Sequence, residues 1–155
     1  MKRLLLLNGP NMNLLGSREE DVYGKISLEE IEKHLTAFVH KHGGQLDCYQ
    51  SNHEGTLIDK IQTAENEYDG IIFNPAAYTH TSIALRDAIK AIHVPVIEVH
   101  ISNVHKREEF RHTSLLAPVC CGQIIGLGVS GYFLAARAFL EYGEKERGIW
   151  GSCQN

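Results

Sequence analysis

Short apolar runs alternate with longer amphipathic segments along this chain. Residues 4–7 are four consecutive leucines, a pattern typical of a strand buried on both faces of a sheet. Ser27 and Glu30 have the spacing of a capping box, which opens many helices. The segment after them carries apolar residues at intervals of three and four, namely Leu28, Ile31, Leu35 and Phe38. It therefore predicts a helix that ends at the glycine pair 43–44.

The same alternation continues through the rest of the chain. Apolar runs at residues 46–49, 71–73, 94–99 and 122–127 predict four more strands, and helices are expected near residues 57–64, 82–92 and 132–142. Strands that alternate with helices form parallel sheets with right-handed crossovers. We expect an α/β protein with a flavodoxin-like, doubly wound, five-stranded parallel sheet and helices on both faces. Residues 1–155 are expected to form a single catalytic domain, with residues 146–155 as a loose tail.

Composition narrows the class of protein. A length of 155 residues suits one core, and a net charge of −4 argues against a general nucleic-acid binder. No apolar run approaches the length of about 20 residues needed to span a bilayer, and the leucines at residues 4–7 are too few for a signal peptide. The four cysteines show no C-x-x-C spacing. We expect reduced thiols in a cytoplasmic protein.

Polar residues gather where the predicted strands end. In open α/β sheets the ligand lies outside the carboxyl ends of the strands. The uncharged hydrogen-bonding residues at these positions include Asn8, Asn11, Ser51, Asn52, His53, Asn74, Tyr78, Thr79, His80, Thr81, His100, Ser102 and Asn103. Singly, each also fits turn or helix-capping chemistry. Their coincidence at one edge predicts a site for a small polyhydroxylated substrate.

Two charged groups extend this edge. Glu98 and His100 are two apart on a predicted strand, so they point to the same side, where a carboxylate can orient an imidazole as a general acid. The alternative is a strand-end salt bridge. Arg107 and Arg111 are four apart and would share a helix face, either as an anion or hydroxyl clamp or as a solvated surface turn.

Residues 17–24 form a charged loop that contains one tyrosine, Tyr23. The loop lies beside the strand-end edge, and Gly16 and Gly24 flank it as possible hinges. Long loops in this position are often active-site lids. Tyr23 is then either a mobile base, with Arg18 favouring its ionised form, or an anchor that pins the loop to the core.

Three other patterns carry less weight. Residues 126–131 match G-x-G-x-x-G, but the second strand and acidic residue of a dinucleotide site do not follow. Ser130 does not sit in a G-x-S-x-G elbow, because Tyr132 replaces the last glycine. Nine histidines show no metal-ligand spacing, so no metal is expected. Acyl or phosphoryl transfer, and a flavin or nucleotide module, remain alternative functions for this fold.

Several segments together resemble the type II 3-dehydroquinate dehydratases, over about residues 3–142. The matching stretches are N-G-P-N-M-N-L-L-G at 8–16, R-E-x-x-x-Y-G at 18–24, N-P-A-A-Y-T-H-T-S at 74–82, R-D-A at 86–88, E-V-H-I-S-N-V-H-x-R-E-x-F-R at 98–111 and G-x-I-x-G-x-G-x-x-G-Y at 122–132. The resemblance implies cofactor-free, reversible anti elimination of water from 3-dehydroquinate through an enolate. It also implies a homododecamer, built as a tetramer of trimers, that acts in the shikimate pathway or in quinate catabolism.

The resemblance also implies roles for individual residues. Tyr23 would be the proton acceptor, supported by Arg18 and with Arg107 as a possible helper, and His100, oriented by Glu98, would be the proton donor. Asn11 would hold a water that stabilises the enolate. The residues implied to bind substrate are Asn74, His80, Asp87, Ile101, Ser102 and Arg111. Asp87 would reach the site of a neighbouring subunit.

Overall fold

A computed structural model describes residues 1–17 and 19–141. Its five strands are β1 (Arg3–Asn8), β2 (Gln45–Gln50), β3 (Gly70–Asn74), β4 (Val96–His100) and β5 (Gly122–Ile125). They form one sheet in the order β2-β1-β3-β4-β5, and every neighbouring pair is parallel. This is the flavodoxin-like order, so the predicted fold class is confirmed.

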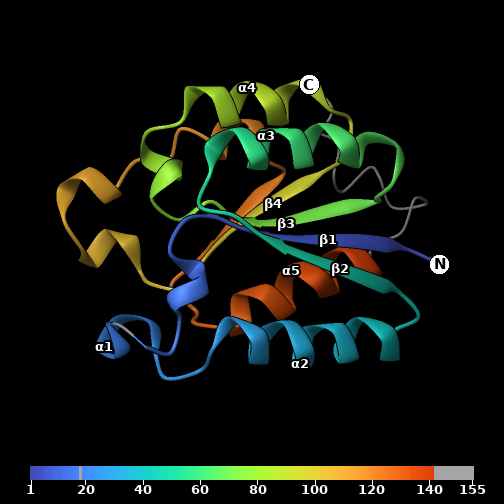
Figure 1. The fold of residues 1–155 in the computed structure, drawn as a ribbon, viewed down its shortest axis with the longest axis horizontal. Coiled ribbons are helices and arrows are strands. Elements are labelled where there is room, and N and C mark those ends of the chain that lie inside the picture. The colour runs from blue at the N-terminus through green and yellow to red at the C-terminus, as the bar shows by residue number, and fades with distance from the viewer. Residues whose placement is uncertain (18, 142–155) are drawn as a thin grey trace.

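Helices cover both faces of the sheet (Figure 1). The helices α2 (Leu28–Lys41) and α5 (Ser130–Glu141) pack on one face, and α3 (Glu54–Thr63) and α4 (Ile83–Ala91) pack on the other. A short helix, α1 (Glu20–Tyr23), lies in the loop after β1, beyond the carboxyl edge of the sheet. Brief 3-10 helices occupy connections elsewhere, at Met12–Leu14, Ala64–Asn66, Ala76–His80, Val104–Lys106, Glu109–Arg111 and Ala117–Val119.

The leucines of β1 divide between two hydrophobic cores. Leu4 and Leu6 pack with the α2 and α5 side, whereas Leu5 and Leu7 pack with the α3 and α4 side. All four have no exposed surface. A central parallel strand is covered on both faces, which is why its sequence is continuously apolar rather than alternating.

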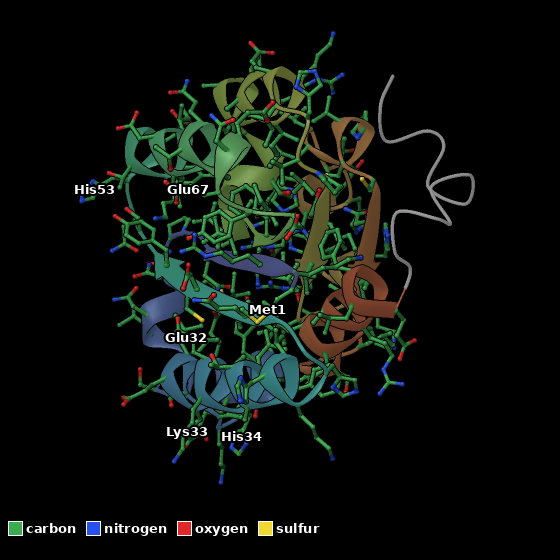
Figure 2. The ribbon with its side chains drawn as sticks, turned by 90° about the vertical axis from the view of Figure 1, so that its right-hand side faces the viewer. Met1, Glu32, Lys33, His34, His53 and Glu67 are labelled. Atoms are coloured by element: carbon green, nitrogen blue, oxygen red, sulfur yellow. The ribbon has the colours of Figure 1, made fainter. Side chains whose placement is uncertain are left out.

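Helix α2 shows how local sequence sets an element. Ser27 accepts a hydrogen bond from the Glu30 amide at 3.2 Å, and the Glu30 carboxylate accepts one from the Ser27 amide at 3.2 Å, so the predicted capping box is present. In Figure 2, Lys33 and His34 point away from the sheet, whereas Glu32 lies on the side of the helix that faces β2. The buried residues of the helix are Leu28, Ile31, Leu35 and Val39, so it presents one apolar face to the core.

Some expectations need correction or lie outside the described residues. Cys121 is disulfide-bonded, so the expectation of four reduced thiols is wrong for this residue, while Cys48 and Cys120 are free. Arg107 and Arg111 do not share a helix face, because Arg107 is in extended conformation between two 3-10 helices. The predicted tail at residues 146–155 lies outside the described residues. Within residues 1–17 and 19–141, no helix is long and apolar enough to cross a membrane.

Candidate active site at the carboxyl edge of the sheet

A cavity of about 290 Å³ opens at the carboxyl edge of the sheet. Segments that follow β1, β3 and β4 line it, together with α1. Of the residues predicted for catalysis, Asn11, Tyr23 and His100 line this cavity. Of those predicted to bind substrate, Asn74, His80, Ile101, Ser102 and Arg111 line it. Residues separated by up to 100 positions in the sequence are therefore brought to one place.

Glu98 forms a buried hydrogen bond with His100. The His100 Nε2 donates to Glu98 Oε2 at 2.5 Å, and the two side chains are almost entirely buried. This contact agrees with the prediction that the two residues point to the same side of β4. Because Nε2 is occupied, Nδ1 is the ring nitrogen available to a ligand. The buried pair is not an exposed strand-end salt bridge.

The Glu98 carboxylate has several further donors. Thr79 donates to it at 2.9 Å, Ser114 at 2.8 Å and Gln123 at 2.8 Å. Burial by itself raises the pKa of Glu98, but the hydrogen bonds from His100, Gln123 and Ser114 and the nearby imidazole charge outweigh it and lower this pKa. The group therefore remains a carboxylate at neutral pH and keeps His100 in a fixed orientation.

Tyr23 enters the cavity from α1. The Arg107 Nη1 donates to its phenol oxygen at 2.7 Å, and the guanidinium carbon lies 5.4 Å from the centre of the ring. Tyr23 also packs against the core on the α2 side. It therefore anchors the loop, as one of the two alternatives expected, and also lines the cavity, while its role as a base stays a prediction. Arg18 lies outside the described residues, so Arg107 is the cation described beside the phenol.

Asn11 adopts a left-handed conformation with a φ of 67°. Asparagine tolerates this region better than most residues. The Asn11 amide donates to Asn52 Oδ1 at 2.9 Å, and Gln50 donates to the same oxygen at 3.1 Å. Tyr78 donates to the Asn52 carbonyl oxygen at 2.8 Å. Asn52 thus holds the turn that carries Asn11.

Positive φ angles cluster around the cavity. Apart from Asn11, the non-glycine residues with positive φ in the described chain are Glu19, at 42°, and Ala76, at 53°, and both line the cavity. Such conformations cost about 1–3 kcal/mol each and persist only where neighbours enforce them. At Ala76 the enforcing neighbour is Asn74, whose Oδ1 accepts from the Ala76 amide at 3.0 Å.

His80 and Arg111 form another part of the cavity wall. The His80 Nδ1 contacts the Thr113 carbonyl oxygen at 2.8 Å, and the His80 and His100 rings stack with centres 6.5 Å apart. Burial, together with the charges of His100 and Arg111, lowers the pKa of His80, although its bond to Thr113 opposes this. Arg111 pairs with Glu108 and lies over the Phe110 ring. His80 is thus kept neutral beside a fixed cation.

Asp87 is the predicted substrate-binding residue that this cavity does not include. It lies on α4, is exposed and does not line the cavity. Its expected role at the site of a neighbouring subunit stays a prediction.

Comparison with known proteins decides which family has this arrangement. The family model described as Dehydroquinase class II matches residues 2–140. The chain belongs to the class II dehydroquinases. A 3-dehydroquinate dehydratase of Anoxybacillus flavithermus is 62% identical over 141 residues, which cover 91% of this chain and 95% of that protein. A 3-dehydroquinate dehydratase of Bacillus pumilus is 58% identical over 143 residues, which cover 92% of this chain and 97% of that protein.

A solved structure agrees with the fold of this dehydroquinase. The crystal structure of a type II dehydroquinase from Butyrivibrio crossotus superposes with a TM-score of 0.88 at 49% identity, and the match covers 89% of this chain and 97% of that one. The sheet order and helix packing described above are therefore those of the family.

Several residues around the dehydroquinase cavity were not predicted from the sequence. Asn52 and Thr79 were noted only as polar strand-end residues, and Ser114 and Gln123 were not singled out. Thr79, Ser114 and Gln123 donate to Glu98. An ionised buried carboxylate requires several donors, so a buried Glu98 indicates that such residues exist. Which donors they are depends on the tertiary fold.

Within the described residues, no cluster of three or more histidine, cysteine, aspartate or glutamate side chains could hold a metal ion. The polar groups that the cavity offers are amide, imidazole, phenol, hydroxyl and guanidinium groups and the Glu19 carboxylate. These bind and polarise a hydroxylated, anionic small molecule and can exchange protons with it.

Proposed function

We propose that this cavity eliminates water from 3-dehydroquinate, with Tyr23 as the base and His100 as the acid. The chain is a 3-dehydroquinate dehydratase, a hydro-lyase, as its family and close relatives show. The mechanism is supported by one observation above others: two candidate proton-transfer groups, each held by a charged partner, line the same cavity. Elimination of water requires one group to remove a proton and another to supply one.

Tyr23 removes the proton next to the ketone as a phenolate, which leaves an enolate. The Arg107 guanidinium, at 2.7 Å, lies where it neutralises the charge of a phenolate, and Arg18 supports the same form. Asn11 holds a water that stabilises the enolate oxygen, where negative charge develops. His100, held by Glu98, then protonates the hydroxyl as it leaves as water. The elimination is reversible, anti, and uses no cofactor or metal.

Other cavity residues position the substrate. Asn74, His80 and Arg111 bind its ring hydroxyls, and the backbone amides of Ile101 and Ser102 bind its carboxylate. Ile101 and Ser102 follow directly from β4, so their position is fixed by the same strand that carries His100. The charged loop that contains α1 acts as a lid that excludes water once substrate is bound.

We also propose that the enzyme assembles as a homododecamer, built as a tetramer of trimers. Asp87, exposed on α4, then reaches the substrate site of a neighbouring subunit. The reaction belongs to the shikimate pathway or to quinate catabolism, and we expect the enzyme to act in the cytoplasm.

Replacement of Tyr23 by Phe tests the assignment of the base. The product contains a conjugated carbonyl and absorbs ultraviolet light where the substrate does not, so its formation is followed directly, with EDTA present. Tyr23→Phe should keep the fold and lower kcat by about 10²–10⁴-fold, the usual contribution of a general base. Near-normal kcat would show that Tyr23 is not the base.

Tyr49→Phe is the matched control. Tyr49 is a partly buried tyrosine on β2 that does not line the cavity. The substitution removes a phenol oxygen, as Tyr23→Phe does. Its kcat should stay within about twofold of wild type, because no proton transfer involves it.

A further inference from the structure

Tyr132, on α5, is fully buried and does not line the cavity, yet its hydroxyl contacts a residue that does. Its Oη accepts a hydrogen bond from Asn74 Nδ2 at 2.9 Å and donates one to Asn8 Oδ1 at 2.6 Å. Asn8 and Asn74 are the last residues of the paired strands β1 and β3. The phenol thus links the ends of two strands to a helix on one face of the sheet.

The direction of each hydrogen bond in this chain is fixed from one end. The Ala76 amide can only donate, and it donates to Asn74 Oδ1 at 3.0 Å, so this oxygen faces Ala76. The Asn74 amide nitrogen must therefore face Tyr132. The Tyr132 oxygen then accepts from Asn74 and gives its own proton to Asn8.

This arrangement determines which group Asn74 can offer to a ligand. One hydrogen of Nδ2 is used by Tyr132, and the other points to Met12 Sδ at 3.7 Å. A thioether sulfur is a weak acceptor. Both Asn74 and Met12 line the cavity, so an oxygen of a bound substrate can replace the sulfur and accept this hydrogen.

We propose that Tyr132 is a positioning residue, whose hydroxyl orients the Asn74 amide so that Asn74 donates a hydrogen bond to a substrate oxygen. Loss of the hydroxyl would remove the buried acceptor of Asn74 Nδ2 and leave this side chain held only through its Oδ1, by the Ala76 amide. This inference rests on the proposed role of Asn74 in binding substrate and extends it to a residue outside the cavity.

Two further observations support a specific role for the phenol. Complete burial raises the pKa of Tyr132, although the hydrogen bond from Asn74 opposes this, so the hydroxyl keeps the proton that it donates to Asn8. The Asn8 Nδ2 is buried and has no partner among the described residues. An unpaired buried donor is unfavourable. If the Asn8 side-chain amide were rotated by 180°, its Nδ2 could donate to the Tyr132 oxygen, but the Tyr132 proton would then have no acceptor. The observed orientation preserves the direction of the chain.

Tyr132→Phe removes only the oxygen and keeps the buried ring. We expect KM for 3-dehydroquinate to rise about 3- to 10-fold, the effect of one lost hydrogen bond, while kcat changes less than about twofold. A contact made equally in the ground and transition states alters KM alone. A purely structural effect would instead reduce the amount of folded enzyme, which lowers apparent kcat and leaves KM unchanged.

Tyr68→Phe is the matched control. Tyr68 is also buried, with 8% of its surface exposed, and its hydroxyl also donates to a side-chain oxygen, Asp47 Oδ2 at 2.8 Å. It does not line the cavity. We expect both Tyr68→Phe and Tyr132→Phe to lower stability in urea unfolding. Tyr68→Phe should keep the wild-type KM.

A double variant identifies the path of the effect. If Tyr132 acts through Asn74, then Tyr132→Phe should not raise KM further in an Asn74→Ala background. An unchanged KM in Tyr132→Phe, or additive effects in the double variant, would overturn the proposal. Wild type that makes no product would instead overturn the proposed function, so the two failures are distinct.

Discussion

At the scale of the residue, Glu98 shows how a charge is kept inside this protein. The side chain has no exposed surface, and burial alone disfavours its carboxylate form. Donors from β4, β5 and two loops surround it, and His100, Thr79 and Gln123 all donate to the same oxygen, Oε2. Because the donors come from separate segments, the buried carboxylate has its full set of hydrogen bonds only when the fold is complete.

This arrangement predicts a change in stability with pH. The folded-state pKa of Glu98 lies below the ordinary value for Glu, about 4.3. Its carboxylate therefore stabilises the fold above about pH 4.3, and the contribution is lost as pH falls through the lowered folded value. Urea unfolding should show Glu98→Gln much less stable than wild type at pH 7, with the difference shrinking below about pH 4.3.

Glu65→Gln is the control for this prediction. The bond from His93 lowers the pKa of Glu65 as well, but Glu65 is only partly buried and its partner His93 is exposed to solvent. Exposed ion pairs contribute little, so this variant should resemble wild type throughout the pH range. A Glu98→Gln deficit that is equal at pH 7 and pH 3.5 would show that Glu98 does not act through its charge.

At the scale of the element, α1 depends on few contacts. It has four residues, and none of them is buried. The base of its loop is tight, because a Cβ on Gly16 would lie 2.8 Å from the Lys25 carbonyl oxygen. Tyr23 connects the other end to Arg107. Opening of this loop, as the proposed lid requires, would therefore break few contacts and leave the buried residues of the two cores in place.

Gly24, directly after Tyr23, tests this independence. Its φ is 81° and its ψ is −175°, a conformation that is almost confined to glycine, although a Cβ would meet no atom within 4 Å. We expect Gly24→Ala to lower kcat/KM at least about tenfold, because the strain of about 1–3 kcal/mol shifts Tyr23. The midpoint of global unfolding should hardly change, as measured by urea titration beside the kinetic assay.

Gly43→Ala provides the comparison. Gly43 has a φ of 80°, also meets no atom within 4 Å, and follows α2 at the opposite edge of the sheet. Here the strain falls on a helix that packs against the core, so stability should drop by about 1 kcal/mol while kcat/KM is unchanged. The opposite result for either glycine would contradict an independently mobile loop.

At the scale of the whole molecule, the proposed oligomer makes one site depend on two chains. Asp87→Ala and Tyr23→Phe should each be inactive as pure proteins. After the two are dissociated, mixed in equal amounts and reassembled, a subunit with Tyr23 is sometimes beside a neighbour with Asp87. About a quarter of the sites are then complete, so about a quarter of wild-type activity should return. No recovery in reassembled oligomers would show that Asp87 does not serve a neighbour.

The sequence predicted elements better than contacts. The leucine run, the capping box at Ser27 and the strand that carries Glu98 and His100 are local patterns, and each lies in the structure as expected. Contacts such as that of Arg107 with Tyr23, 84 positions apart, depend on the tertiary fold instead. The positive φ angle of Asn11 escaped prediction for the same reason, since Asn52, 41 positions away, holds its turn.

The four leucines of β1 also have a consequence for anyone who redesigns this protein. Since both faces of the strand are apolar, a shift of the strand by one residue would place a leucine where another leucine was. The leucines alone therefore do not define the strand's register. The polar ends define it instead: Arg3 donates to Asp47 at 2.9 Å and to Asp69 at 2.7 Å, and Asn8 accepts from Tyr132. The middle of β1 can be varied in composition but not in length. One residue more or fewer would displace Asn8, which accepts from Tyr132, and Tyr132 in turn contacts Asn74 in the cavity wall.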